Sequence, residues 1–214
     1  MELDECIRKR ISVKNYLNKE VPNDIIGLVL EAASLAPSAG NLQNWKFILV
    51  KDENKKADIA EACKNQNWMN QAPAFIIVCN DEKIITSMYG DRGKLYSTQD
   101  CAIAAQNIML KAADLGLATC WVGSFDTERI KKILEIPEDV TPEMVLTLGY
   151  SEEKPEYHDR EPVTRVTFFD KWGKKTDEKS LFPLGQTAEK YFKTISKQVK
   201  KQNIWEKIKS KFKK

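Results

Sequence analysis

Two kinds of hydrophobic spacing alternate along most of the chain. Apolar residues at helical spacing, such as Ile25, Leu28 and Val29, predict amphipathic helices, whereas short unbroken apolar runs such as 47–50 predict buried strands. The pattern predicts helices at about residues 2–10, 22–35, 53–63, 95–115 and 126–134, and strands at about 45–51, 74–80, 118–124, 143–150 and 163–169. This order of elements is typical of an α+β fold or a mixed α/β sandwich.

The predicted helix at 95–115 has small residues around nearly its whole circumference, namely Ala102, Ala104, Ala105, Ala112 and Ala113. Small side chains let neighbouring elements approach closely on several sides. We therefore expect this helix to be either the buried axis of the domain or part of a subunit interface.

The end of the chain differs from the rest in charge. Residues 171–214 contain 14 lysines and four acidic residues, a net charge of +10, although the whole chain carries only +3. The first 170 residues therefore have a net charge of −7. Apolar residues recur in the tail at near-helical spacing and predict basic amphipathic helices: Tyr191, Ile195, Val199, Ile204, Trp205, Ile208 and Phe212.

These differences predict a domain of residues 1–170 followed by a basic amphipathic extension of residues 171–214. We expect the extension to pack with its apolar face on the domain or across a dimer. Contact with an anionic membrane surface, or with an acidic partner or nucleic acid, is the alternative. No segment resembles a nucleic-acid-binding motif, so we expect no nucleic-acid partner.

The composition is typical of a globular protein of a reducing compartment. The chain has 214 residues, of which 42% are hydrophobic, and this is enough for a sizeable core. It has no apolar run near 18 residues, and its N-terminus alternates charges where a signal peptide has an apolar stretch. The five cysteines are widely spaced and form no C-x-x-C pair. We therefore expect a cytoplasmic protein.

Several common chemistries are excluded by the residues present. His158 is the only histidine, which excludes a histidine-rich zinc site and leaves a Cys-His nucleophile only this one ring. The chain contains neither G-x-G-x-x-G nor G-x-x-x-x-G-K-[ST], so a bound phosphate would not be held by a Rossmann turn or a P-loop.

A loop of small residues joins the second predicted helix to the first predicted strand. Ser38, Ala39 and Gly40 present backbone amides with almost no side-chain cover, and Asn41 and Gln43 can each donate and accept hydrogen bonds. Such a loop can bind the edge of a planar heterocycle. An ordinary helix-to-strand turn is the alternative.

A cationic segment lies near the N-terminus. In an extended chain side chains alternate, so Arg10, Ser12 and Lys14 should point to one face. An arginine, a hydroxyl and a lysine together suit a phosphate with an adjoining polyol. A solvated basic surface is the alternative.

Together these two segments resemble the nitroreductase family of FMN-dependent flavoproteins. Residues 10–14 are similar to its Arg-Arg-Ser-x-Arg signature, with Ile11 and Lys14 in place of arginines. Residues 37–45 resemble its Pro-Ser-x-x-Asn-x-Gln-Pro-Trp segment, with Asn44 in place of the second proline. The likeness continues through the central helix, Gly-Leu-Gly turn and Trp-x-Gly strand of residues 100–123 and through the closing segments 148–150 and 160–162.

The resemblance implies a nitroreductase-type α+β sandwich with a central antiparallel or mixed sheet flanked by helices, which forms a homodimer and carries a C-terminal helical extension. It implies one FMN per subunit, bound at the subunit interface, and transfer of electrons from NAD(P)H to a nitroaromatic, quinone or similar flat acceptor by a ping-pong mechanism. A flavin-binding or storage protein without efficient turnover, and a family member with dehalogenating activity, are the alternatives.

FMN would carry the chemistry, so we expect no catalytic side chain and no metal. The resemblance implies that Arg10, Ser12 and Arg160 hold the phosphate and ribityl chain, and that Lys14 lies near the pyrimidine edge. Residues 37–41 would reach the ring from the partner subunit. The full expected cofactor-binding set is Arg10, Ile11, Ser12, Lys14, Pro37, Ser38, Ala39, Gly40, Asn41, Gln43, Trp121, Val122, Gly123, His158 and Arg160.

Two further segments are weaker candidates. Asn67 or Gln66 could reach the pyrimidine edge of a flavin. The stretch Ser87–Ser97, with Tyr89, Arg92 and Tyr96, is expected to be either a substrate lid or a solvated loop.

Overall fold

The computed structural model describes residues 2–153 and 160–175 of the chain and divides it into two compact units, residues 1–156 and 157–214. Each unit is described by itself. The first contains, in order, α1 (Leu3–Lys9), α2 (Asn23–Ser34), η1 (Ala39–Asn41), β1 (Trp45–Val50), α3 (Glu53–Ala62), η2 (Asn67–Gln71), β2 (Ala74–Asp81), α4 (Lys83–Tyr89), α5 (Asp91–Asp114), β3 (Ala118–Val122), α6 (Thr127–Leu134) and β4 (Val140–Gly149).

A four-stranded sheet with the order β1-β2-β4-β3 forms the centre of the first unit. All three strand pairs are antiparallel, with Ile77 opposite Ile48 on β1 and Val145 on β4. Outside the strands, Ser12 forms an isolated parallel bridge with Thr119 on edge strand β3. The sheet therefore places the N-terminal segment directly beside β3.

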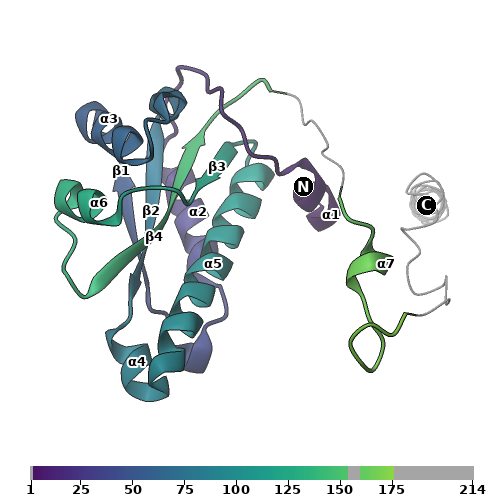
Figure 1. The fold of residues 1–214 in the computed structure, drawn as a ribbon. Helices are drawn as coiled ribbons and strands as arrows, with labels where there is room; N and C mark the ends of the chain where they lie inside the picture. Colours follow the sequence, from purple (N-terminus) through teal and green to yellow (C-terminus); the bar gives the residue numbers. More distant parts are fainter. Residues whose placement is uncertain (1, 154–159, 176–214) are drawn as a thin grey trace, which may run out of the picture. The chain divides into compact units, whose positions relative to one another are not determined.

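Helices cover both faces of this sheet. Figure 1 shows α2 and α5 on one face, with α3 and α6 on the other. Strand β2 is buried on both faces, because Ile76 points into the first core and Phe75 and Ile77 point into the second. This double burial explains why β2 is an apolar run and not the alternating pattern of a half-exposed antiparallel strand. The predicted α+β sandwich is confirmed.

One predicted strand is wrong. Residues 163–169 were expected to be a strand, but Val163–Val166 form the single helical turn α7, preceded by Pro162. A strand needs a partner for its backbone groups. The described residues 160–175 of the second unit contain no strand to supply one.

The stretch Ser87–Ser97 is helical and not the solvated loop that was one of its two interpretations. It spans the end of α4 and the start of α5, which begins four residues earlier than the expected start at about 95. Gly90 joins the two helices with φ +57°, in the left-handed region that glycine adopts without strain. Gly93 then lets α5 lie against α4, because a Cβ there would be 2.7 Å from the carbonyl oxygen of Ile85.

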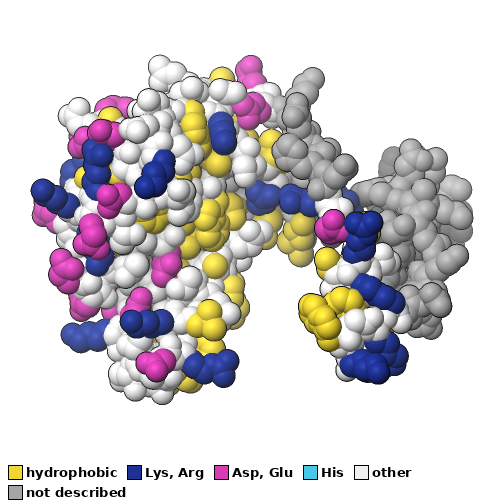
Figure 2. Space-filling model, in the orientation of Figure 1, with side chains coloured by type: hydrophobic (Ala, Val, Ile, Leu, Met, Phe, Trp, Pro, Cys, Tyr) yellow, Lys and Arg dark blue, Asp and Glu magenta, His cyan; other side chains and the backbone are white. Residues whose placement is uncertain are grey.

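The alanine-rich helix α5 is the buried axis of the first unit. Ala104, Ala105 and Ala112 are fully buried in the core shared with α2 and the sheet. The opposite side of α5 is solvent-facing, and Leu95 and Ile103 are 53% and 40% exposed. Figure 2 shows hydrophobic side chains on the surface along this flank of the first unit.

The basic extension lies almost entirely outside the described residues, since residues 176–214 are not described. The structure divides the chain after Glu156, earlier than the boundary near residue 170 that the sequence suggested. The division into a cofactor-binding domain and a basic extension stays a prediction. Among the described residues, no helix is long and apolar enough to span a membrane.

Candidate functional site

The cationic segment is extended, as predicted. After α1 ends, Val13 donates its backbone N–H to the carbonyl of Thr119, at 3.0 Å. Val13 is buried, whereas its neighbours Ser12 and Lys14 are exposed. Because side chains alternate in an extended chain, Ser12 and Lys14 lie on the same side of the segment.

Arg10, Ser12 and Lys14 all act electrostatically on one side chain of β3, the thiol of Cys120. Burial raises the pKa of the Cys120 thiol, while the positive charge of Lys14, a hydrogen bond from Ser12 and the charge of Arg10 act in the opposite direction. In the part of the first unit that the structure describes, no carboxylate forms an ion pair with Arg10 or Lys14. The site therefore offers two unpaired cations and a hydroxyl, which is the donor set of a phosphate site.

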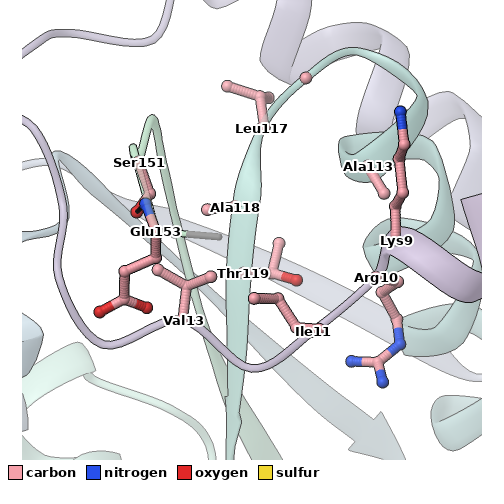
Figure 3. Close-up of a pocket in the computed structure, with 11 residues that line it drawn as sticks. Lys9, Arg10, Ile11, Val13, Ala113, Leu117, Ala118, Thr119, Ser151 and Glu153 are labelled. Atoms are coloured by element: carbon pink, nitrogen blue, oxygen red, sulfur yellow. Dashed lines mark hydrogen bonds between the residues drawn. The ribbon is translucent and has the colours of Figure 1, made fainter. Parts of the chain in front are cut away.

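A cavity of about 270 Å³ adjoins Arg10. Figure 3 shows Lys9 and Arg10 on one side of it and Glu153 on the other, with Val13 and Thr119 between them. Ser12, Lys14 and Cys120 do not line this cavity, so of the three cationic-segment residues only Arg10 reaches it.

The small-residue loop is held rigidly in a backbone conformation that is uncommon outside glycine. Gly40, Asn41 and Gln43 have φ values of 57°, 56° and 49°. Gln43 donates its backbone N–H to the hydroxyl of Ser38 and its side-chain amide to the side-chain oxygen of Asn41. The left-handed conformation of non-glycine residues is typical of functional sites. The bond between the side chains of Asn41 and Gln43 uses the amide nitrogen of Gln43 and the oxygen of Asn41.

Asp100 anchors this loop, and the sequence analysis missed it. The buried carboxylate of Asp100, on α5, accepts the backbone N–H of Ala39 with both oxygens at 3.1 Å. The signal available in the sequence was an acidic residue at the start of an otherwise apolar, alanine-rich helical stretch. A buried carboxylate needs a hydrogen-bond donor.

Tyr89 covers the same loop from α4. A Cβ on Gly40 would lie 2.8 Å from the Tyr89 hydroxyl, so this hydroxyl lies close over the loop, and the positive φ of Gly40 itself favours glycine. The ring of Tyr89 packs edge-on against Tyr96 at 5.4 Å between centroids, and the guanidinium of Arg92 lies 5.8 Å from the Tyr96 ring. The three candidate lid residues thus form one aromatic and cationic cluster beside the loop.

Replacing Asp100 by asparagine is expected to reduce the fall in the free energy of unfolding that occurs as the pH rises. Burial raises the pKa of Asp100 above 3.8, and the hydrogen bond from Ala39 lowers it by less. The folded protein therefore binds this proton more tightly than the unfolded chain does. The resulting stabilisation is full below 3.8 and is lost as the pH rises through the folded pKa.

Urea unfolding at several pH values between about 4 and 7 measures this effect as the free energy of unfolding. The decline with rising pH should be smaller in Asp100→Asn than in the unaltered protein. Asp139→Asn, at an exposed position, is the matched control. Equal slopes in the unaltered protein and Asp100→Asn would contradict the assignment.

The segment from Trp121 to Gly123 lies at the end of edge strand β3. Val122 is buried, while Trp121 is 37% exposed and Gly123 is exposed. A Cβ on Gly123 would be 3.3 Å from the indole nitrogen of Trp121, so the indole lies close over this backbone. The end of β3 therefore presents an exposed aromatic side chain and an exposed glycine close to Cys120.

One chain does not bring all the predicted site residues together. Ala39 is bound to Asp100, which lies 14 residues before the end of α5 at Asp114, or about 21 Å along the helix axis. The cationic segment is attached to β3, which follows that end. No hydrogen bond or ion pair joins residues 37–43 to residues 10–14 within the described ranges.

The remaining candidate cofactor-binding residues do not belong to the loop, to the cationic segment or to the end of β3. His158 lies outside the described residues, and Arg160 is exposed in the second unit. Gln66 donates its side-chain amide to the carbonyl of Cys63, whereas Asn67 is exposed at the start of η2. The ammonium of Lys14 lies 5.5 Å from the ring of Trp68, next to Asn67.

Among the described residues, no group of three or more His, Cys, Asp or Glu side chains could hold a metal ion. All five cysteines are free and buried. Burial raises the pKa of Cys63 and of Cys79 to about 12, so these thiols are unreactive at neutral pH.

Comparison with known proteins identifies the family. The sequence model of the Nitroreductase family matches residues 7–82 and 63–150. A protein of Methanothermobacter thermautotrophicus named "Putative NADH dehydrogenase/NAD(P)H nitroreductase" is 35% identical over 176 residues, which cover 80% of this chain and 88% of that protein.

Solved structures agree with the sequence comparison. An FMN-dependent nitroreductase of Clostridium difficile R20291 superposes with a TM-score of 0.68 at 26% identity, covering 79% of this chain and 99% of that one. NfrA2 of B. megaterium superposes with a TM-score of 0.74 at 26% identity, covering 91% of this chain and 84% of that one.

Proposed function

The chain belongs to the nitroreductase family, and on this premise we propose that it is an FMN-dependent oxidoreductase that transfers electrons from NAD(P)H to a nitroaromatic, a quinone or a similar flat acceptor. The observation that carries the proposal is that Arg10, Ser12 and Lys14, without a carboxylate partner, all act on one side chain of β3, the thiol of Cys120. Three such donors suit the phosphate and polyol of FMN.

The residues present fit FMN, because they combine donors suited to a phosphate with an exposed aromatic side chain and an exposed glycine at the end of β3. Arg10 and Ser12 would bind the phosphate and ribityl chain, helped by the backbone amide of Ile11. Arg160 and His158, which belong to the second unit, stay candidates from the family resemblance. Lys14 would lie near the pyrimidine edge, where its charge favours an electron-rich ring. The backbone of Trp121 to Gly123 would meet another edge of the ring system.

When bound, FMN would supply the hydride and electron transfer itself. The chain's own residues would orient the donor and the acceptor over the ring and keep water away. Tyr89 and Tyr96 offer flat apolar surfaces for this purpose beside the loop of residues 38–41. Because donor and acceptor would use one site in turn, we expect ping-pong kinetics.

We propose a homodimer in which the loop of residues 37–41 completes the partner's site. Within one chain this loop is attached about four helical turns away from the end of α5. In a dimer, the loop of the second subunit would supply what one chain does not bring to the site. The cytoplasmic location and the packing of the basic extension stay predictions.

The visible absorption of the purified protein tests the proposal first, because bound oxidised flavin is yellow. Release of the cofactor distinguishes FMN from FAD. Steady oxidation of NADH or NADPH with a nitroaromatic or quinone acceptor then tests turnover. A protein that stays colourless after incubation with FMN would overturn the proposal, and a yellow protein without turnover would favour a flavin-storage role.

Replacing Ile103 by glutamate is expected to convert dimer to monomer and to lower FMN retention in parallel. Ile103 is 40% exposed on the outer side of α5, and a charge buried there against a second subunit would lack a partner. Ala105 and Ala112 are unsuitable positions for this test, because both are fully buried within the subunit.

Analytical ultracentrifugation with absorbance at the flavin band measures both quantities together. Leu49→Glu is the matched control, since Leu49 is 39% exposed on β1 at the other edge of the sheet. A monomeric Ile103→Glu protein with full flavin content would remove the shared-site hypothesis.

A further inference from the structure

A buried chain of hydrogen bonds joins the cationic segment to two strands of the sheet. The hydroxyl of Tyr16 donates to the backbone carbonyl of Val13 at 2.9 Å and lies 2.6 Å from the hydroxyl of Thr147, on β4. The Thr147 oxygen in turn accepts the backbone N–H of Cys120, on β3, at 3.1 Å. Thr147 is fully buried and Tyr16 is 8% exposed.

These hydrogen bonds meet at the Thr147 hydroxyl. It lies 2.6 Å from the Tyr16 hydroxyl and 3.4 Å from the carbonyl of Cys120, so it can donate to either, and it accepts the Cys120 amide. Hydrogen bonds linked in this way polarise and strengthen one another. Burial also raises the pKa of the Tyr16 phenol far above its usual value, so Tyr16 remains a donor at any ordinary pH.

Both polar groups of Val13 are therefore fixed. Its N–H is bound to Thr119 and its carbonyl to Tyr16. Val13 lies between Ser12 and Lys14, so the same bonds determine where those two side chains leave the backbone. Without the phenol, the segment would be held at this point by a single backbone bond to an edge strand.

The space for the Tyr16 ring depends on a glycine. A Cβ on Gly149, at the end of β4, would lie 2.8 Å from the Tyr16 ring, so the ring rests directly on the strand backbone. The backbone N–H of Tyr16 is bound to the side chain of Gln71 at 3.2 Å. Tyr16 is thus locked from several sides and provides a rigid anchor for Val13.

We propose that Tyr16 and Thr147 are positioning residues for the cofactor site, which hold Ser12 and Lys14 at Cys120 through the carbonyl of Val13. This inference rests on the proposed function, because the ligand positioned against these groups would be FMN. Neither residue would touch the cofactor itself.

Tyr16→Phe and Thr147→Val, each in the full-length protein, remove one hydroxyl from the chain of hydrogen bonds and nearly preserve the side-chain shape. Each is expected to raise the FMN dissociation constant roughly 3- to 10-fold, the effect of one net hydrogen bond. Each should also shift the midpoint potential of bound FMN to more negative values, because Lys14 would be held less firmly near the ring. The double variant should bind FMN about as weakly as either single variant, since all three break the same unit.

Two variants serve as matched controls. Thr147→Ser keeps the hydroxyl, and Tyr150→Phe removes a hydroxyl that forms no hydrogen bond within the described residues, one position beyond β4. Both should stay within roughly 2-fold of the unaltered affinity. A further measurement does not need the cofactor: amide hydrogen exchange of residues 11–16 in the FMN-free protein should be faster in Tyr16→Phe and Thr147→Val than in either control.

The outcomes are distinguishable. A lower melting temperature together with unchanged FMN affinity, potential and exchange would show that Tyr16 and Thr147 are purely structural and would overturn the inference. Failure of the unaltered protein to bind FMN would overturn the proposed function and, with it, positioning for FMN. Faster exchange together with weaker FMN binding and a shifted potential would support both.

Discussion

Arg10→Ala and Arg160→Ala are each expected to weaken FMN binding by about 1.5 to 3 kcal/mol, which is the usual contribution of a hydrogen bond to a charged group. Arg10 has no carboxylate partner among the described residues of its unit, so its charge is available to a phosphate. Arg160 is exposed in the second unit and matches the closing segment of the family resemblance. Titration of the FMN-free protein, followed by flavin fluorescence, measures the change.

Arg129→Ala is the control for the loss of an arginine. Arg129 lies on α6 and is ion-paired with Glu61 on α3, on the opposite face of the sheet from α5. Its removal should leave FMN affinity unchanged. If Arg10→Ala and Arg160→Ala both kept their full flavin content through extensive dialysis, the phosphate assignment would be wrong.

Gly149→Val should lower the free energy of unfolding by about 2 to 3 kcal/mol, because overfilling a packed site forces its neighbours to move. A Cβ at this position would lie 2.6 Å from Pro73 and 2.8 Å from the ring of Tyr16. The Pro73 ring cannot move away unless the backbone moves, and the Tyr16 ring cannot move away unless its hydrogen bond to Val13 breaks. Because Tyr16 would be displaced, FMN binding should fall together with stability.

Gly27→Ala is the matched control for adding a side chain to a glycine. Gly27 lies inside α2, and a Cβ there meets nothing within 4 Å. This substitution should stabilise the protein by about 0.5 to 1 kcal/mol, since alanine has the higher helix propensity. Urea unfolding of both variants tests the pair, and a Gly149→Val protein as stable as the unaltered one would contradict the close packing.

The hydrophobic pattern predicted most of the fold for a physical reason. The four strands that form the sheet have apolar side chains on buried faces, and α2, α5 and α6 each have buried apolar positions at helical spacing. The hydrophobic spacing predicts these elements because the side chains that recur at that spacing are the ones buried on one face. The prediction failed at 163–169, where a strand was expected but Val163–Val166 form a helical turn and no partner strand is present in the described part of that unit.

The cofactor-binding role of the candidate residues stays a prediction. The extended geometry of residues 10–14 was expected from the sequence, and the charges of Arg10 and Lys14 and a hydrogen bond from Ser12 all act on Cys120. Asp100, Thr147 and Tyr16 could not be found in the same way, because their partners are far away in the sequence. Asp100 binds Ala39, 61 residues away, and Tyr16 and Thr147 are 131 residues apart. No local pattern reports such contacts.

By itself, the sequence determined the layered α+β architecture, the cationic segment, the small-residue loop and the family to which the chain belongs. These features depend on local hydrophobic spacing and on short motifs, and both can be recognised within a single stretch of residues. Only the tertiary structure showed that α5 buries its alanines within the subunit and that Ser87–Ser97 is helical. It also showed that the loop of residues 37–43 is bound to α5, whereas the cationic segment of residues 10–14 is bound to β3. The reason is that burial, helix packing and long-range hydrogen bonds are relations between segments, and they exist only once the chain has folded.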